Sequence, residues 1–464
     1  MKLNYKRTIL VGFAFFLICA FWQAYDNTVP LILTNKFGMS QTWSGVIMAM
    51  DNVLALFLLP LFGHISDKCT HPRGRRTPFI VVGTLIAAVA LIALSFADNA
   101  QLKRLDKVSA IDDPAALTVI YNEQKDATLL SPSGESFILG HKFTEAEFTA
   151  IRSQTVNDEG KTVTDPAYTN YVVPARQARD AAAANPGALV VFVALLLIIL
   201  LSMATFRSPA VALMPDVTPK PLRSKANAVI NLMGSAGGII VLALGMVFAT
   251  ASVSNSMMSY TGYFGVIAAL MLAALVVFML TVREPEWARE MQAQSVAAGI
   301  EDAEETDHPN EGRKLSADEV KSLLLILLSI VLWFFGYNAV TSKYSVYASN
   351  ILHKDYNLTL IIAQAAAIAA YLPVGFIAGK IGRKKTILAG VVMLTVAFGV
   401  AGFLTADSPA ALMNAMFALA GIAWATINVN SFPMVVELAS GGDVGKYTGF
   451  YYTASMAAQV ATPM

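Results

Sequence analysis

The chain has few charged residues and very few cysteines. Lys, Arg, Asp and Glu make up 14% of its 464 residues, whereas hydrophobic residues make up 56%, and the mean hydropathy is +0.56. Soluble domains carry about 25% charged residues, so this composition argues against a water-soluble protein. The two cysteines, Cys19 and Cys69, lie in an apolar block and a basic loop. At such different depths they do not indicate a disulfide framework.

The sequence also lacks the motifs of common enzyme classes. It contains no His-Glu-x-x-His, no Gly-x-Ser-x-Gly, no phosphate-binding glycine loop and no Cys/His metal cluster. We therefore expect no enzymatic activity, no cofactor, no bound metal and no nucleic-acid partner. The lipid bilayer is the partner that this composition indicates.

The chain contains many long runs of apolar residues. About 20 apolar residues in a helix can cross a hydrocarbon core of about 30 Å. Such blocks lie near residues 8–33, 43–65, 77–97, 188–214, 225–250, 261–282, 319–347, 358–380, 385–405, 410–436 and 445–464. The sequence therefore predicts an all-α integral membrane protein.

The apolar blocks fall into two groups. Six form an N-terminal bundle (1–282) and five a C-terminal bundle (319–464), and between them the charged stretch 283–318 is typical of a mobile linker. Residues 98–187 are polar and hold no block long enough to span. They predict a long loop insertion that serves as a lid or accessory domain. Two equal halves would need a twelfth helix, so we expect the second bundle to be truncated at Met464.

Basic residues in the short loops predict the orientation, because cytoplasmic loops carry an excess of Lys and Arg. The loops of one side hold Lys2, Lys6, Arg7, Lys68, Arg73, Arg75, Arg76, Lys220, Arg223, Lys225, Lys380, Arg383, Lys384 and Lys385. The opposite short loops hold little more than Lys36 and Lys354. We expect a multi-pass protein of the cell membrane with a cytoplasmic N-terminus and linker, and with 98–187 on the other side.

The two groups of helices repeat a motif in the loop after their second helix. Residues 63–76 contain Gly63-x-x-x-Asp67-Lys68 and then Gly74-Arg75-Arg76, and residues 375–385 contain a related pattern. This loop resembles the signature of the major facilitator superfamily. The resemblance implies two pseudo-symmetric six-helix bundles with a substrate site at their interface. We expect a cytoplasmic gate built from Gly63, Asp67, Arg75, Arg76 and Arg383.

A narrower resemblance rests on Gly-Arg-Arg-Thr-Pro-Phe-Ile at 74–80, with support from 207–216 and 445–449. These segments are similar to the glycoside–pentoside–hexuronide:cation symporters and the related sucrose carriers. The resemblance implies a secondary transporter that couples a mono- or disaccharide to a proton or sodium gradient. Position 59 is Leu, where the melibiose-type branch carries a second acidic residue, which argues against that branch's sodium site.

Four ionisable residues fall inside the apolar blocks: Asp26, Asp51, Arg207 and Lys343. Such groups are expensive in a membrane and mark ion or substrate pathways. We expect Asp26 and Asp51 to carry the coupling ion, with Arg207 or Lys343 compensating their charge. The guanidinium of Arg207 also suits sugar hydroxyls or a carboxylate. The alternatives are a structural pair for Asp26 and a Lys343 that snorkels to the interface.

Amides near these charges complete the predicted site, which would work in a monomer by alternating access. We expect sugar hydroxyls to bind Gln23, Asn27, Asn52 and Asn338. Two alternatives stay open. One is an efflux carrier for amphiphilic compounds, although the glycine-rich segment 234–238 lacks the Gly-Pro motif common in those carriers. The other is a non-transporting membrane sensor that uses residues 98–187.

Overall fold

The computed structural model describes most of the chain. The described residues are 2–105, 112–132, 134–157, 160, 162–183, 186–250, 258–300, 315–350, 356–405, 408–439 and 443–462. Within some helices the side chains of 41–42, 182–183, 342–343, 345–350 and 356–358 are not described.

Among the described residues, eleven long helices form the body of the molecule, and each corresponds to one predicted apolar block. The first group is α1 (Tyr5–Asn35), α2 (Gln41–Asp67), α3 (Thr77–Leu102), α8 (Pro186–Asp216), α9 (Arg223–Val247) and α10 (Thr261–Thr281). The second is α13 (Ala317–Asn350), α14 (Tyr356–Ile381), α15 (Arg383–Ala401), α16 (Ala410–Val436) and α17 (Val444–Ala461). In the described part of the chain, ten of them are long and apolar enough to cross a membrane, and α17 is the exception. The all-α membrane fold predicted from the sequence is confirmed.

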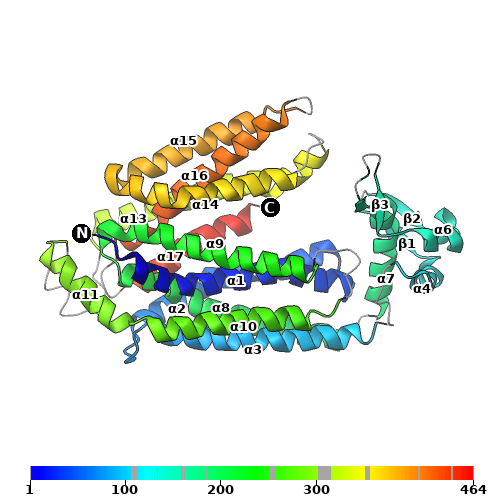
Figure 1. Cartoon of the computed structure of the whole chain (residues 1–464), viewed down its shortest axis with the longest axis horizontal. Helices are drawn as coiled ribbons and strands as arrows, with labels where there is room; N and C mark the ends of the chain where they lie inside the picture. Colours follow the sequence, from blue (N-terminus) through cyan, green and yellow to red (C-terminus); the bar gives the residue numbers. More distant parts are fainter. Residues whose placement is uncertain are drawn as a thin grey trace.

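The long helices run side by side and give the molecule two ends (Figure 1). We call the end with the arginine-rich loop 68–76 the basic end, and the opposite end, beyond α3, the domain end. Helix α1 begins at the basic end, where Asn4 accepts a hydrogen bond from the Arg7 amide (3.2 Å) and so caps the helix.

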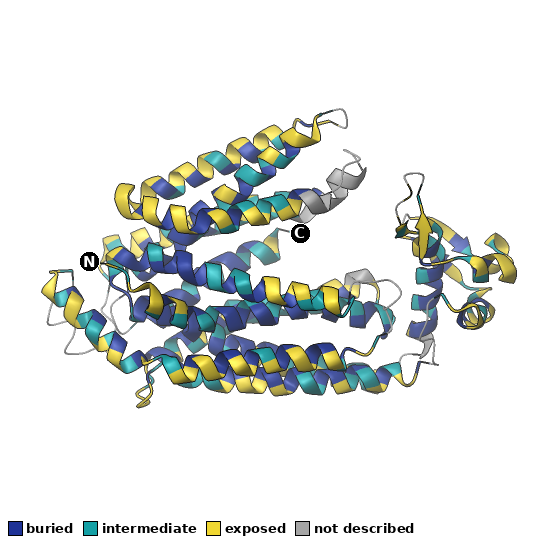
Figure 2. Ribbon diagram, in the orientation of Figure 1, coloured by how far each residue is buried: buried dark blue, intermediate teal, exposed yellow. Residues whose placement is uncertain are grey.

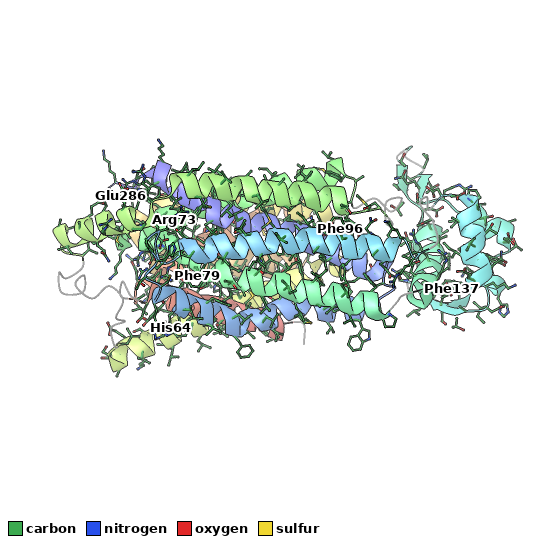
Figure 3. All side chains as sticks on the ribbon, turned by 90° about the horizontal axis from the view of Figure 1, so that it is seen from below. His64, Arg73, Phe79, Phe96, Phe137 and Glu286 are labelled. Carbon is green, nitrogen blue, oxygen red and sulfur yellow. The ribbon has the colours of Figure 1, made fainter. Side chains whose placement is uncertain are left out.

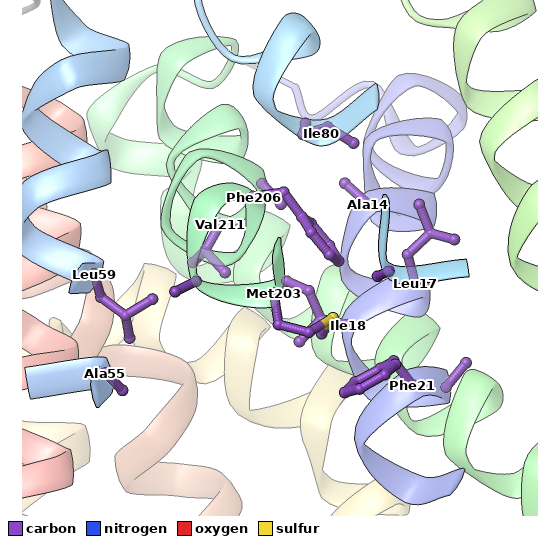
Figure 4. Close-up of a cluster of buried hydrophobic side chains, with 14 of the residues drawn as sticks. Ala14, Leu17, Ile18, Phe21, Ala55, Leu59, Ile80, Met203, Phe206 and Val211 are labelled. Atoms are coloured by element: carbon purple, nitrogen blue, oxygen red, sulfur yellow. The ribbon is translucent and has the colours of Figure 1, made fainter. Parts of the chain in front are cut away.

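Apolar side chains pack where the helices meet, and other apolar side chains cover the outside. Leu17 and Phe21 of α1 meet Met203 and Phe206 of α8 in the interior (Figure 4). On α15 the exposed residues follow the outer side of the helix (Figure 2). Exposed Leu388 is one of many large apolar residues there. An outer surface of this kind suits lipid as the surrounding solvent.

A buried ion pair holds the first group of helices together at the domain end. The Lys36 ammonium lies 2.6 and 2.7 Å from the two Asp98 oxygens and 2.7 Å from the Met258 carbonyl oxygen. Neither charged side chain is exposed. Because an unpaired charge would be costly here, this contact fixes the end of α1 against α3 and the chain before α10.

Residues 112–183 form a small accessory domain at the domain end (Figure 1). Its elements are α4 (Pro114–Gln124), β1 (Thr128–Leu130), β2 (Ser136–Ile138), α5 (Leu139–Lys142), α6 (Glu145–Ala150), β3 (Gln154–Val156), β4 (Thr162–Thr164), the π-helix Tyr168–Val172 and α7 (Val173–Ala183). The strands make two antiparallel hairpins, β1–β2 and β3–β4. Leu117, Phe148 and Val172 belong to a separate hydrophobic core.

The accessory domain touches the bundle where α7 meets the turn after α1. Gly38 has a φ of +61°, and a methyl group there would lie 2.2 Å from the Ala181 amide nitrogen. Both the backbone conformation and the close approach therefore require glycine.

The linker differs from the mobile chain expected between the two groups. Residues Glu284–Ala297 form helix α11, and Glu284 and Trp287 at its start are buried. Residues 301–314 of the linker lie outside the described part. The difference arises because α11 has tertiary partners at the basic end, which local composition does not reveal.

The stability of the accessory domain should depend on pH through Asp180. This carboxylate is buried, 3.7 Å from the Arg176 guanidinium, and Arg179 nearby pairs with Glu123 (2.8 Å). Burial, the largest influence, raises the Asp180 pKa to about 7, although both arginines oppose the shift. A carboxyl group whose pKa is higher in the folded state than in the unfolded state favours folding while it is protonated. This contribution to the free energy of unfolding is lost as the group ionises in the folded protein. The domain should therefore lose a few kcal/mol as the pH rises from about 4 to about 7, at about 1.4 kcal/mol per pKa unit.

Hydrogen exchange of α7 in the full chain, corrected for intrinsic rates, measures this loss. Asp180→Asn should flatten the pH dependence, whereas Glu145→Gln at an exposed position should keep it. A wild-type pH dependence in Asp180→Asn would show that this carboxylate is not its source.

Candidate functional site

A buried arginine organises the basic end. Arg76 directly precedes α3, and its guanidinium is not exposed. It donates to Asp67 Oδ1 (2.5 Å), to Asp216 Oδ2 (2.7 Å) and to the Ser66 hydroxyl. Arg75 donates to the other oxygen of Asp216 (2.9 Å). Two carboxylates and two guanidinium groups thus compensate one another at the ends of α2, α3 and α8.

Asp67 extends this network into the second group of helices. The backbone amides of Gly445 and Lys446 donate to its two oxygens, at 2.8 Å each. These amides lie in the first turn of α17, where a negative charge also interacts favourably with the helix dipole. One aspartate therefore binds an arginine of its own half and the helix terminus of the other.

Glycines allow the two halves to touch along α2 and α17. A methyl group at Gly63 would lie 2.1 Å from the Gly445 carbonyl oxygen, and one at Gly449 would lie 2.3 Å from Pro60 Cα. The opposing atoms are backbone, so no side-chain rotation could relieve such a clash. The basic end is consequently closed between α2 and α17.

A second contact closes the basic end between α9 and the C-terminal half. Arg383 donates to the Ser224 hydroxyl and the Lys220 carbonyl oxygen (2.6 Å each) and pairs with Glu437. The predicted gate residues Gly63, Asp67, Arg75, Arg76 and Arg383 all lie at this end. Asp67, Gly63 and Arg383 touch the opposite half, whereas the described pairs of Arg75 and Arg76 lie within the N-terminal half.

Sequence reasoning did not assign Glu284 to this network. Its carboxylate accepts from the amides of Arg76 and Thr77 (2.8 Å each) and from the Thr77 hydroxyl (2.7 Å). It therefore caps the start of α3 from the linker helix. Asp216 was also not predicted as a member of this network. It ends the segment 207–216, and its position as an acidic residue at the basic end of an apolar block is the feature that could have predicted its role.

Arg207 lies at mid-depth, where the halves meet. Its guanidinium carbon is 5.4 Å from the Trp22 ring centroid and 4.9 Å from that of Tyr452. These distances are typical of cation–π contacts, and they join α8 and α1 to α17. A cavity of about 10 Å³ beside Arg207 is also lined by Trp22 and Asp51, and it has room for about one water molecule.

The two acids of the predicted site lie near Arg207. Asp26 is exposed and Asp51 is half-buried, and Asp51 accepts from the Asn52 amide (2.6 Å). Both carboxylates interact electrostatically with Arg207 and with each other. Neither forms an ion pair with a side chain that the structure describes. The two carboxylates and the guanidinium group therefore lie in one region, but no direct ion pair among the described side chains neutralises them.

The predicted amides divide between the two halves. Gln23 donates to Asn27 (3.2 Å) one turn along α1, so both lie beside Asp26 in sequence. Asn338 is half-buried on α13, and its amide nitrogen has no hydrogen-bond partner. The backbone of Lys343 belongs to α13, but its side chain lies outside the described residues.

A polar network that sequence reasoning missed crosses the interface between the halves. Asn231 of α9 accepts from the Asn428 amide of α16 (3.4 Å), and Asn428 in turn accepts from the Tyr451 hydroxyl of α17 (3.2 Å). Asn227 donates to the Val429 carbonyl oxygen (2.9 Å). Isolated asparagines inside apolar helices were the available signal. Within the described residues, no group of three His, Cys, Asp or Glu could hold a metal ion.

Short segments of curated proteins match the chain. The Arabidopsis thaliana sucrose transport protein SUC4 is 37% identical over 62 residues, which are 13% of this chain and 12% of that protein. Sucrose transport protein SUC3 of the same plant is 39% identical over 67 residues, 14% and 11% of the two chains. The matches thus span about an eighth of each relative.

Solved structures match nearly the whole fold. The proton:xylose symporter XylE bound to 6-bromo-6-deoxy-D-glucose aligns with a TM-score of 0.58 and 16% identity, over 99% of this chain and 87% of that one. A bacterial homologue of the iron transporter ferroportin gives 0.56 and 13%, over 99% and 91%. FucP in the outward conformation gives 0.55 and 12%, over 98% and 90%. At such identities the likeness establishes the fold and not the substrate.

Two family descriptions match the sequence itself. "MFS/sugar transport protein" matches residues 10–102. "Major Facilitator Superfamily" matches residues 181–463, which is more than half of the chain. The chain is a multi-pass membrane transporter that belongs to the major facilitator superfamily.

Proposed function

We propose that the protein is a cation-coupled sugar symporter that works by alternating access. The observation that carries the proposal is the group of Asp26, Asp51 and Arg207 at mid-depth, in which Arg207 contacts Trp22 of one half and Tyr452 of the other. The short matches to sucrose carriers and the sugar-transport description over residues 10–102 support a sugar as the substrate.

The coupling ion would bind at Asp26 and Asp51. A carboxylate exposed at this depth would be costly against lipid, so we infer that Asp26 faces a water-filled path. A proton or sodium ion would neutralise one acid, and Arg207 would stabilise the other. Such binding drives transport only if the two conformations differ in ion affinity.

The sugar would bind beside the same charges. The rings of Trp22 and Tyr452 offer apolar faces for stacking, and the Arg207 guanidinium and the Gln23 and Asn27 amides offer hydrogen bonds to hydroxyl groups. The cavity of about 10 Å³ beside Arg207 is too small for a sugar. We infer that substrate binding moves the two halves apart at this level.

The basic end would be cytoplasmic and closed in this conformation. Its loops carry the excess of Lys and Arg. Opening it would require Asp67 to release the α17 amides and Arg383 to release Ser224 and the Lys220 carbonyl oxygen. These are short polar contacts that water can replace.

Asp26→Asn should uncouple transport. The neutral amide cannot take up a proton or pair with sodium, so uphill accumulation of sugar in proteoliposomes should fall by at least tenfold. Sugar exchange without a gradient should persist. Glu145→Gln, a surface change in the accessory domain, serves as the control. Uphill uptake at the wild-type rate in Asp26→Asn would exclude this residue from coupling.

Arg207→Lys should weaken sugar binding more than it weakens folding. Lysine keeps the charge but loses the planar fork that stacks between two rings, so we expect the apparent sugar affinity to fall about tenfold. Uptake of sucrose, maltose, glucose and xylose by the wild-type protein under imposed proton and sodium gradients first identifies a transported sugar. The concentration dependence of its uptake then gives the apparent affinity of both proteins. Transport of no sugar under either gradient would overturn the proposed function.

Gly445→Ala should hold the basic end open. The new methyl group would lie 2.4 Å from the Gly63 carbonyl oxygen, so α2 and α17 could not close. Ser208→Cys, with Cys19 and Cys69 replaced by serine, provides a reporter, because Ser208 is buried and donates to the Gly445 carbonyl oxygen (3.4 Å). A membrane-impermeant thiol reagent on the basic side should label it several-fold faster.

Gly399→Ala is the matched control, because a methyl group at Gly399 meets nothing within 4 Å. Its labelling rate should equal that of the reporter alone. Equal rates in all three proteins would mean that the α2–α17 contact is not a gate.

A further inference from the structure

A second cavity lies at the basic end, where its lining residue Met214 is about two turns of α8 from Arg207. It has a volume of about 280 Å³ and is lined by residues 2–4 and the first turns of α1, by the end of α8 and the α8–α9 connection, and by helix α11. Figure 3 shows this end of the molecule, with Arg73 and Glu286 near it and the accessory domain opposite. None of its lining residues belongs to the proposed sugar path or to the gate contacts.

The wall formed by α11 is firmly attached. Arg7 of α1 forms an ion pair with Glu290 and lies 5.2 Å from the Trp287 ring centroid. Trp287 and Met291 are buried, and Glu284 fixes the start of the helix to α3. The cavity is therefore present before any ligand binds, so binding would not have to order the wall.

The lining is apolar at its base and hydrogen-bonding at its rim. Val11, Met214 and Leu222 are buried apolar residues. The polar lining residues are Lys2, Asn4, Arg7, Thr8, Thr218, Glu290 and Gln294. Glu290 compensates Arg7, whereas the Lys2 ammonium leaves one positive charge in excess at an exposed position. This combination favours an anion with several hydrogen-bonding oxygens and a short carbon chain.

We propose that this cavity binds a phosphate ester of a small polyol. Lysine is a common point-charge partner for phosphate, and the amides of Asn4 and Gln294 with the Thr218 hydroxyl suit the polyol. Two sources share this chemistry: the phosphoglycerol headgroup of an anionic lipid in the adjoining leaflet, and a soluble polyol phosphate. The proposal does not depend on the sugar-transport function.

Ligand binding here would also influence the gate. A bound ester would join α1 and the α8–α9 connection to α11, and so favour the docked position of α11 in which Glu284 caps α3 beside Arg76. A ligand that binds this arrangement more tightly shifts the protein toward it. We therefore expect the ester to stabilise the closed basic end.

The test measures binding to the full chain in detergent by calorimetry. The lipid probes are dihexanoyl phosphatidylglycerol and, as the zwitterionic control, dihexanoyl phosphatidylcholine. The soluble probes are glycerol 3-phosphate and glycerol. We expect binding of the anionic phosphoglycerol probes, and no binding of phosphatidylcholine, whose choline group carries a compensating positive charge, or of glycerol, which has no phosphate. Binding of the lipid alone assigns the leaflet as the source, and binding of glycerol 3-phosphate assigns the cytosol, and both outcomes support the site.

Two pairs of variants locate the site. Lys2→Met should weaken binding at least tenfold, whereas Lys6→Met, at an exposed lysine in the first turn of α1 and outside the lining, should not. Gln294→Ala should weaken binding several-fold, unlike Gln292→Ala on the same helix. No binding of either phosphoglycerol probe, or equal loss in Lys2→Met and Lys6→Met, would overturn the proposal.

A gate readout accompanies the binding test. In the Ser208→Cys reporter, saturating phosphoglycerol should slow thiol labelling from the basic side by several-fold, and Lys2→Met should abolish the effect. Binding without any change in labelling would overturn the coupling of this cavity to the gate.

Discussion

The closed conformation depends on the burial of one guanidinium group, that of Arg76. A charge removed from water is tolerated only when partners surround it, and here Asp67, Asp216 and Ser66 do so. Because Asp67 also binds the first amides of α17, the same charge that fixes α2, α3 and α8 in one half depends on the position of the other half. Glu284 adds the linker helix to this assembly. Closure at the basic end is thus one connected set of polar contacts, and it leaves little room for partial opening.

The charged side chains at mid-depth lack the direct ion pairs that are found at the two ends of the N-terminal half. At both ends of the N-terminal half, buried ions have direct partners, as in Lys36 with Asp98 and Arg76 with Asp67. Asp26, Asp51 and Arg207 share a region without such pairing among the described side chains. The protein therefore concentrates its uncompensated charge at one level of the membrane, between the closed gate and the accessory domain. There an ion or a polar substrate can change the electrostatic balance most.

Much of this organisation follows from local sequence. The apolar blocks predicted the long helices, and the motif at 63–76 predicted the arginines and the aspartate at the closed end. What could not be predicted depends on contacts between distant segments. Nothing near Glu284 shows that it caps α3, and nothing near Asn231 shows that it faces Asn428. The linker helix α11 has polar, unremarkable composition, and its order depends on partners in α1 and α3. For the predicted site, sequence located the charges but did not show that the rings of Trp22 and Tyr452 flank Arg207.

The accessory domain has a further practical consequence. Its close contact with the bundle, Gly38 against Ala181, is made to the N-terminal half, and its own core makes it a compact body outside the helices. A rigid antibody fragment raised against it would be a fiducial mark for single-particle imaging. Such a mark would add mass and asymmetry to a particle otherwise hidden in its lipid disc. Its tilt relative to the C-terminal half would report, image by image, how far one half has rotated against the other.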